Sequence, residues 1–182
     1  MAEQQVKAKK TIKKSFFEVK SGLTGTKMSL YGTSMEELNG RVIRLDLTRS
    51  LRGKSLELKL RVKHENNALV GEPISLALAG SFIRRMIRKG TDYIEDSFQV
   101  ECRDGKAIIK PFMITRNKVS RGVRNSLRVE TKKFLEGYSK ARTGRELFGD
   151  IMSNKIQKEL SLKLKKIYPL ALCEIRVFEV NK

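Results

Sequence analysis

The stretch SFQVECRDGKAIIKPFMITR, residues 97–116, constrains the fold more than any other part of the sequence. Two strand-like runs flank Asp104 and Gly105, and an Asp-Gly pair suits the tight turn of a β-hairpin. We therefore expect two neighbouring antiparallel strands here. Pro111 lies in the second run. Because proline has no N–H to donate to a ladder, it predicts an edge position or a β-bulge.

Further strands are predicted from the alternation of apolar and polar side chains. The clearest case is SLELKLRVK, residues 55–63, in which every second residue is apolar. A turn at Gly53 joins this strand to the apolar run at 41–51 and predicts a hairpin. Other strand-like runs lie at residues 15–21, 28–31, 67–80 and 170–180. Pro73 is expected to interrupt the third of these runs.

Helices are predicted from apolar spacing and from their end residues. A short helix over 81–90 is expected to begin at Ser81 and to stop at Gly90. Its apolar residues are Phe82, Ile83, Met86 and Ile87. Thr143 followed by Glu146 is a capping-box pattern that predicts another helix start. A further helix is expected over about 153–166, with Ile156, Leu160 and Leu164 facing inward.

Basic residues recur every three or four positions in ITRNKVSRGVRNSLRVETKKFLEGYSKAR, residues 114–142. On a helix, at about 100° per residue, the apolar residues form a core-facing stripe of Val123, Leu127, Phe134 and Tyr138. A second stripe, displaced by roughly 120°, consists of Arg121, Arg124, Arg128 and Lys132 and is called the basic stripe below. Like charges at this spacing repel each other. Because few glutamates intersperse them, we expect an external anion to neutralise the stripe.

The charge of the whole chain indicates what that anion is. The formal net charge is +19 in 182 residues, and the pI is near 10.2. Nucleic acid is the expected partner, since each neutralised phosphate releases a condensed counterion. RNA is favoured over DNA because the sequence contains no helix-turn-helix or zinc-finger pattern. Phe16, Phe17 and Tyr31 either stack on bases or belong to the core, and the core interpretation is favoured.

The residues expected to contact RNA lie in several segments. They are Lys7, Lys9, Lys10, Lys13 and Lys14 in a flexible basic arm at residues 1–14; Arg84, Arg85, Arg88 and Lys89 in the short helix; Arg116 and Lys118; and Arg121, Arg124, Arg128 and Lys132 of the basic stripe. Residues 15–182 are expected to form a single α+β RNA-binding domain.

Patterns of catalytic and metal-binding residues are missing from the sequence. The GLTGTK stretch at 22–27 lacks the glycine spacing of a phosphate-binding loop. Cys102 and Cys173 are expected to be buried thiols of a reducing cytosol, and His64 a solvated residue at a strand end. No run approaches the roughly 18 apolar residues of a membrane-spanning helix. We expect no enzyme, no metal, no cofactor, no small-molecule substrate and no membrane contact.

Several blocks, taken in order, resemble the S3Ae family of archaeal and eukaryotic small-subunit ribosomal proteins. The blocks are KKSFFEVKS, GRVIRLDLTRSL, SLELKLRVKHENNALVG, SFIRRMIRKGTDYIEDSFQVECRDG, ITRNKVSRGVRNSLR and KKIYPLALCEIRVFEV. The likeness covers roughly residues 13–180. Phe17 stands where family members often have Trp. The short basic arm and the missing carboxy-terminal extension favour an archaeal-type member.

The resemblance implies a fold and a function. The fold is an α+β domain with a curved, barrel-like, mostly antiparallel sheet and about three to four helices, two of them C-terminal. The function is that of a structural constituent of the cytoplasmic ribosome, on the platform of the small subunit near the mRNA exit. The implied partners are small-subunit rRNA and neighbouring ribosomal proteins. The resemblance also lends the segment from Arg116 to Lys132 an RNA-facing role.

Two other functions stay open from the residues alone. A free-standing RNA chaperone or ribosome-assembly factor would have the same charge pattern. A nuclease would need carboxylates such as Asp46 or Asp96, but the acidic residues are scattered and show no catalytic pattern.

Overall fold

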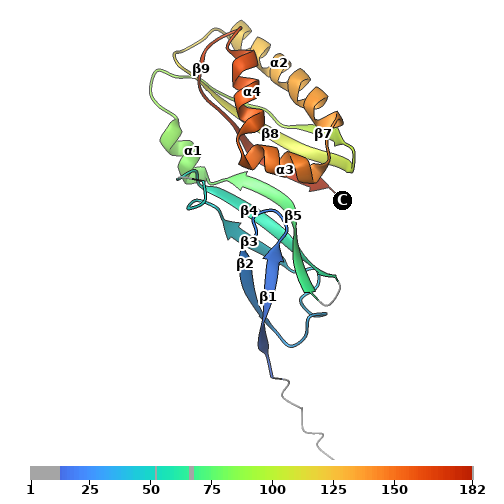
Figure 1. Ribbon diagram of the computed structural model, residues 1–182. Helices are drawn as coiled ribbons and strands as arrows, with labels where there is room; N and C mark the ends of the chain where they lie inside the picture. The colour runs from blue at the N-terminus through green and yellow to red at the C-terminus, as the bar shows by residue number, and fades with distance from the viewer. Residues whose placement is uncertain (1–12, 52, 66–67, 182) are drawn as a thin grey trace, which may run out of the picture. The chain divides into compact units, whose positions relative to one another are not determined.

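A computed structural model of the chain describes residues 13–51, 53–65 and 68–181 (Figure 1). This part of the chain contains four helices and nine strands, and the strands form a mixed sheet that is not closed. The expected α+β class, with two C-terminal helices, is confirmed. Residues 1–12 of the expected basic arm lie outside the described residues.

The chain divides into two compact units, and β4 and β5 run through both. One unit, called the hairpin unit, contains the described residues up to Arg41 together with Arg61–Glu72. The other, called the helical unit, contains Val42–Leu60 and the chain from Pro73 onward. The expectation of one domain over residues 15–182 stays a prediction.

The hairpin unit is built on two strands that the sequence predicted. They are β1 (Ser15–Ser21) and β2 (Lys27–Gly32), which pair antiparallel with Phe16 opposite Tyr31. The end of β1 also pairs in parallel with Leu69–Gly71 of β5. Alternation leaves one face of this hairpin exposed and turns the other toward the core.

Close packing of the inner face depends on a glycine. A Cβ at Gly32 would lie 2.8 Å from the Cδ2 atom of Leu38, a side chain that is fully buried. Because Gly32 has no side chain, Leu38 can pack directly against the backbone of β2. Among the described residues of this unit, Val19, Val62 and Leu69 are buried as well.

The helical unit contains the remaining elements. In chain order they are β3 (Val42–Asp46), the first part of β4 (Leu56–Glu65), the last part of β5 (Ala68–Leu78), α1 (Gly80–Met86), β6 (Tyr93–Glu95), β7 (Phe98–Cys102), β8 (Gly105–Thr115), α2 (Arg121–Lys140), α3 (Gly144–Met152), α4 (Lys155–Leu164) and β9 (Leu170–Asn181). β8 is central: it pairs with β9 on one edge and with β6 and β7 on the other, always antiparallel. β5 pairs with the far edge of β9.

The hairpin expected at Asp104 and Gly105 is confirmed. Cys102 of β7 lies opposite Gly105, whose φ of +142° favours glycine. The expected bulge is also present, as a register shift between Lys110 and Pro111. β7 pairs with β8 up to Ile109 and β6 begins to pair at Phe112, so Pro111 lies in the gap between them on that edge. Because Pro111 pairs with neither β6 nor β7, its lack of an N–H removes no hydrogen bond to these two strands.

Helices α2 and α4 pack on one another and on the sheet (Figure 1). Their shared core contains Ile94, Met113, Leu127, Leu160 and Leu164, all buried. Helix α3 packs on β9 through the edge-to-face rings of Phe148 and Phe178, whose centroids are 4.8 Å apart. The predicted inward face of the helix near 153–166 is confirmed, since Ile156, Leu160 and Leu164 are buried.

The short helix differs from its prediction at both ends. Helix α1 follows Ala79, which has no side-chain cap bond, so Ser81 is not the N-cap. It stops at Met86 because the backbone of Ile87 is extended, and Ile87 is exposed instead of packed. Gly90, with φ of +83°, belongs to the turn beyond the helix.

Two strands also differ from the prediction. β5 is continuous through Pro73, which lies between the residues paired with β1 and those paired with β9. The proline therefore removes no hydrogen bond from those two ladders. β6 was not predicted, because its three residues, Tyr93–Glu95, are too few to show alternation.

Candidate nucleic-acid interface

Helix α2 begins after a loop that is anchored to the sheet. Asp92 Oδ2 accepts a hydrogen bond from the N–H of Val119 at 2.9 Å. The N–H of Thr115 donates to the Asp92 carbonyl oxygen, also at 2.9 Å. Arg116 and Lys118 therefore lie, exposed, on an anchored loop and not on the helix that the sequence pattern predicted.

Ser120 explains why the helix begins at Arg121. Its backbone is extended, and its Oγ atom accepts a hydrogen bond from the N–H of Val123 at 3.4 Å. The first turn contains no acidic residue. Arg121 and Arg124 instead lie near the positive end of the helix macrodipole, where cations disfavour the helix. The charges of this end therefore do not serve the stability of the helix.

The inner face of α2 is close to the predicted one. Leu127 is buried, while Val123, Phe134 and Tyr138 are half-buried. The buried face is completed by residues that the apolar pattern did not include, namely Thr131, Leu135 and Ser139. Thr131 and Ser139 are polar, so hydrophobic spacing alone could not identify them.

Three arginines of the basic stripe line one hollow on the surface of α2. The hollow is lined by Arg121, Gly122, Arg124, Asn125 and Arg128. Arg121 and Arg128 are exposed, whereas Arg124 is half-buried and its buried Nε atom has no hydrogen-bond partner in the described part of the chain. Sequence reasoning missed Gly122 and Asn125, because neither has a charge to mark it.

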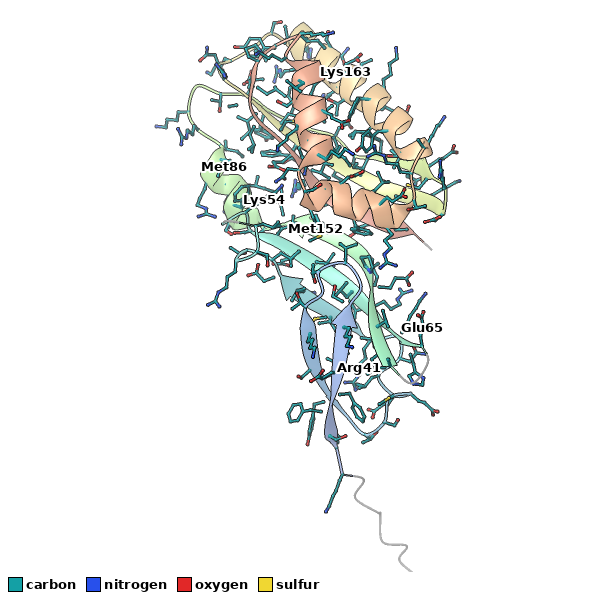
Figure 2. All side chains as sticks on the ribbon, viewed as in Figure 1. Arg41, Lys54, Glu65, Met86, Met152 and Lys163 are labelled. Atoms are coloured by element: carbon teal, nitrogen blue, oxygen red, sulfur yellow. The ribbon has the colours of Figure 1, made fainter. Side chains whose placement is uncertain are left out.

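Carboxylates near α2 are already paired with other cations. Glu130 accepts from Lys163, a residue of α4 labelled in Figure 2, at 2.9 Å, and this hydrogen bond lowers the pKa of Glu130. Glu136 lies 3.9 Å from Lys132, the one member of the basic stripe outside the hollow. Among the residues that the structure describes, no carboxylate is within ion-pair distance of Arg121, Arg124 or Arg128. The hollow is therefore a site of uncompensated positive charge.

The other residues that the sequence predicted to contact RNA do not line this hollow, whose lining residues all belong to α2. Arg84 and Arg85 are exposed on α1, and Arg88 and Lys89 are exposed in the turn after it. Lys13 and Lys14 are exposed before β1, while Lys7, Lys9 and Lys10 lie outside the described residues. Only residues of α2 therefore line the hollow, and these other described basic residues belong to other parts of the chain.

The sequence left two roles open for Phe16, Phe17 and Tyr31, packing in the core or stacking on bases, and the structure shows that their exposure differs. Phe17 is half-buried on the inner face of β1. Phe16 is 76% exposed and Tyr31 is 52% exposed on the outer face. The favoured core interpretation is therefore wrong for Phe16 and Tyr31.

Cys102 and Cys173 are both partly buried, not fully buried as the sequence predicted. Both are free thiols. Burial, aided by the Glu174 carboxylate, raises the pKa of Cys173 to about 12, and burial also raises the pKa of Cys102. Across the described residues, no helix is both long and apolar enough to cross a membrane.

Together the fold and its surface define an α+β protein in which Arg121, Arg124 and Arg128, none of them in an ion pair among the described residues, line a hollow on one long helix. The chain belongs to the Ribosomal S3Ae family, whose model matches residues 3–182, and the resemblance seen in the sequence is thereby confirmed. It is similar to two archaeal proteins that are both named small ribosomal subunit protein eS1.

The protein of Methanothermobacter thermautotrophicus is 28% identical over 133 residues, which cover 70% of this chain and 68% of that relative. The protein of Nanoarchaeum equitans is 27% identical over 99 residues, which cover 54% of this chain and 50% of the relative. The match therefore spans about half the length of the second relative.

Proposed function

We propose that this chain is a structural constituent of the small ribosomal subunit that binds small-subunit rRNA through the hollow on α2. The proposal includes its place on the platform near the mRNA exit, in contact with neighbouring ribosomal proteins, which the family resemblance implies. Its role there is to hold rRNA in a folded arrangement and not to catalyse a reaction. Both archaeal relatives are named small ribosomal subunit protein eS1, which supports a role in that subunit.

The observation that carries the proposal is the electrostatics of the first two turns of α2. Arg121, Arg124 and Arg128 gather at the positive end of a helix that has no acidic residue in its first turn. An anion at this position would satisfy both the guanidinium groups and the free N–H groups of the helix end. A phosphodiester suits the hollow because a guanidinium can donate two parallel hydrogen bonds to it.

The test replaces Arg121 and Arg128 by glutamate in the full chain. Hydrogen bonds to charged groups contribute about 1.5–3 kcal/mol each, so affinity for a transcript of archaeal small-subunit rRNA should fall by about a hundredfold or more. Thermal melting should stay constant or rise, because glutamate is favourable near a helix N-terminus. Filter binding and circular dichroism measure the two effects. Arg124 is left intact because it is half-buried.

A matched control reverses two other charges of the same helix. Lys133 and Lys140 are exposed and lie about 120° around the axis from Arg121 and Arg128. The Lys133→Glu/Lys140→Glu variant has the same net charge as the test variant and should keep most of the affinity. Equal losses in both variants would mean that only net charge matters, and the α2 hollow would not be the site. Release of the chain from small subunits by a high-salt wash would favour an assembly factor.

A further inference from the structure

The outer face of the β1–β2 hairpin presents two aromatic rings side by side. Phe16 and Tyr31 are directly opposite in the strand register, and their ring centroids lie 5.0 Å apart at an interplanar angle of 47°. The inner face of the same hairpin packs through Val19 and Gly32. The core of the hairpin unit therefore does not need Phe16, whose exposed ring leaves apolar area in water.

The charges around the two rings favour a polyanion as their partner. Residues 13–32 contain four lysines and a single glutamate. The Nζ atom of Lys14 lies 5.9 Å from the centroid of the Tyr31 ring, a cation–π distance. Lys13 and Lys20 are exposed, and Glu18 lies 3.7 Å from Lys27. An acidic polymer with flat apolar groups fits this surface better than an apolar protein face would.

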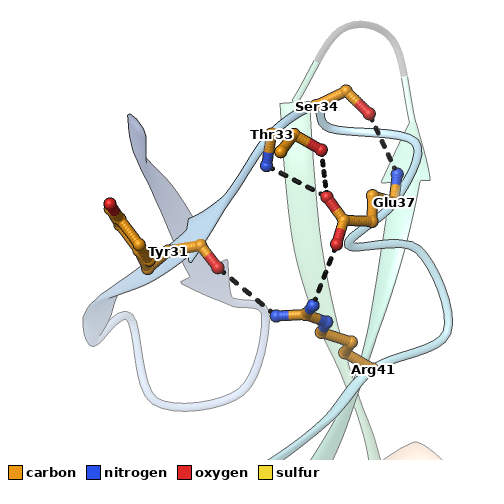
Figure 3. A network of polar contacts seen from close by, with 5 residues as sticks. All are labelled: Tyr31, Thr33, Ser34, Glu37 and Arg41. Carbon is orange, nitrogen blue, oxygen red and sulfur yellow. Dashed lines mark hydrogen bonds and ion pairs between the residues drawn. The ribbon is translucent and has the colours of Figure 1, made fainter. Parts of the chain in front are cut away.

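A polar network holds Tyr31 in position (Figure 3). Arg41 donates from one guanidinium nitrogen to the Tyr31 carbonyl oxygen and from the other to Glu37 Oε1, both at 3.3 Å. The hydroxyl and the N–H of Thr33 donate to the other carboxylate oxygen of Glu37. These bonds lower the pKa of Glu37, so its carboxylate stays ionised at neutral pH. The backbone of Tyr31 is therefore linked by hydrogen bonds to the segment that contains Glu37 and Arg41.

We propose that Phe16 and Tyr31 form a platform on which unpaired bases of RNA stack, with Lys13, Lys14 and Lys20 binding the flanking phosphates. Proteins that bind single strands without sequence preference combine exposed aromatic rings, on which bases stack, with nearby cations that contact the phosphates. The proposal rests on the proposed RNA-binding function and adds a second contact of a different kind. The α2 hollow would bind phosphates alone, whereas the Phe16–Tyr31 platform would bind bases.

The experiment compares two probes that differ only in their bases. One is a short oligouridylate, and the other is an abasic phosphodiester of the same length. The full chain should bind the oligouridylate more tightly, and Phe16→Ala should reduce that preference. Loss of one base stack should weaken oligouridylate binding by about 5- to 150-fold and leave abasic binding unchanged. Fluorescence anisotropy of labelled probes gives both affinities.

A conservative variant separates stacking from folding. The sequence contains no tryptophan, so Phe16→Trp introduces a single indole. This variant should keep the preference for bases, and its fluorescence should be quenched by oligouridylate but not by the abasic probe. Tyr93→Ala removes an aromatic ring that is 55% exposed on β6 and serves as the control, with no change expected.

The outcomes distinguish the two proposals. Equal binding of both probes by the full chain, with Phe16→Ala unchanged, would overturn the platform and leave the α2 hollow intact. The rings would then be assigned to a protein neighbour. Failure of the full chain to bind either probe or rRNA would overturn the proposed function itself. A Phe16→Trp variant that binds oligouridylate without quenching would also overturn the platform.

Discussion

Lys54 and Glu174 form an ion pair that is largely removed from water. The Lys54 Nζ atom lies 2.5 Å from Glu174 Oε2, and their side chains are 10% and 14% exposed. The same ammonium group donates to Asn154 Oδ1 at 2.7 Å. The pair thus ties the turn between β3 and β4 to the start of α4 and to β9. Because both charges are desolvated, each depends on the other.

Replacing Lys54 by methionine should therefore destabilise the protein strongly. It leaves the Glu174 carboxylate buried without its cation, at a cost of about 3–5 kcal/mol in the free energy of unfolding. Urea denaturation followed by circular dichroism measures this change. Lys158→Met, which removes an exposed lysine of α4, should change the value by less than about 0.5 kcal/mol. If the two variants unfold alike, the pair contributes nothing to stability.

At the scale of elements, helix α3 is defined by its first turn. Thr143 Oγ1 accepts from the N–H of Glu146 at 3.3 Å, and Glu146 Oε2 accepts from the N–H of Thr143 at 2.9 Å. Both bonds of the capping box that the sequence predicted are present. The pattern was sufficient here because all its atoms lie within four consecutive residues.

Thr143→Ala should lower the free energy of unfolding by about 1 kcal/mol, and Thr143→Ser should preserve it. The bond from Thr143 also lowers the pKa of Glu146 below its ordinary value of 4.5. Glu146 therefore stabilises the fold above pH 4.5, and its contribution is lost as the pH falls through the lowered pKa. Urea titrations at neutral and acid pH should show a smaller pH dependence for Glu146→Gln. An unchanged pH dependence would contradict this role.

Helix α2 shows where local patterns are insufficient. The recurrence of Arg and Lys over residues 114–142 predicted a helix but did not mark its start. The start depends on Ser120 and on the Asp92 carboxylate, which comes from the segment before β6. The sequence assigned Arg124 to the same stripe as Arg128, but Arg124 is half-buried. Which side of a helix is exposed depends on how the helix packs and not on where its charged residues lie.

At the scale of the whole molecule, the number of phosphates that the chain neutralises determines how RNA binding depends on salt. Each phosphate neutralised contributes about 0.7–0.9 to the slope of log affinity against log salt. Arg121→Glu/Arg128→Glu should therefore make the slope for the rRNA transcript shallower by roughly one unit per arginine. Phe16→Ala should leave the slope unchanged, since stacking releases no counterions. Binding isotherms over a salt series test both statements. An unchanged slope for Arg121→Glu/Arg128→Glu would contradict the first, and a shallower slope for Phe16→Ala would contradict the second.

Local patterns were sufficient to predict the hairpin at Asp104 and Gly105 and the N-cap of α3, and the order of the sequence blocks indicated the family and, through it, the α+β class. These depend on residues near one another in the chain, or on their order along it. Three further findings needed the folded chain: Arg121, Arg124 and Arg128 share a hollow, Arg116 and Lys118 lie on a loop, and Phe16 and Tyr31 face solvent. The exposure of a side chain depends on which face of its helix or strand is covered. The residues that cover that face are distant in the sequence, so local patterns do not reveal them.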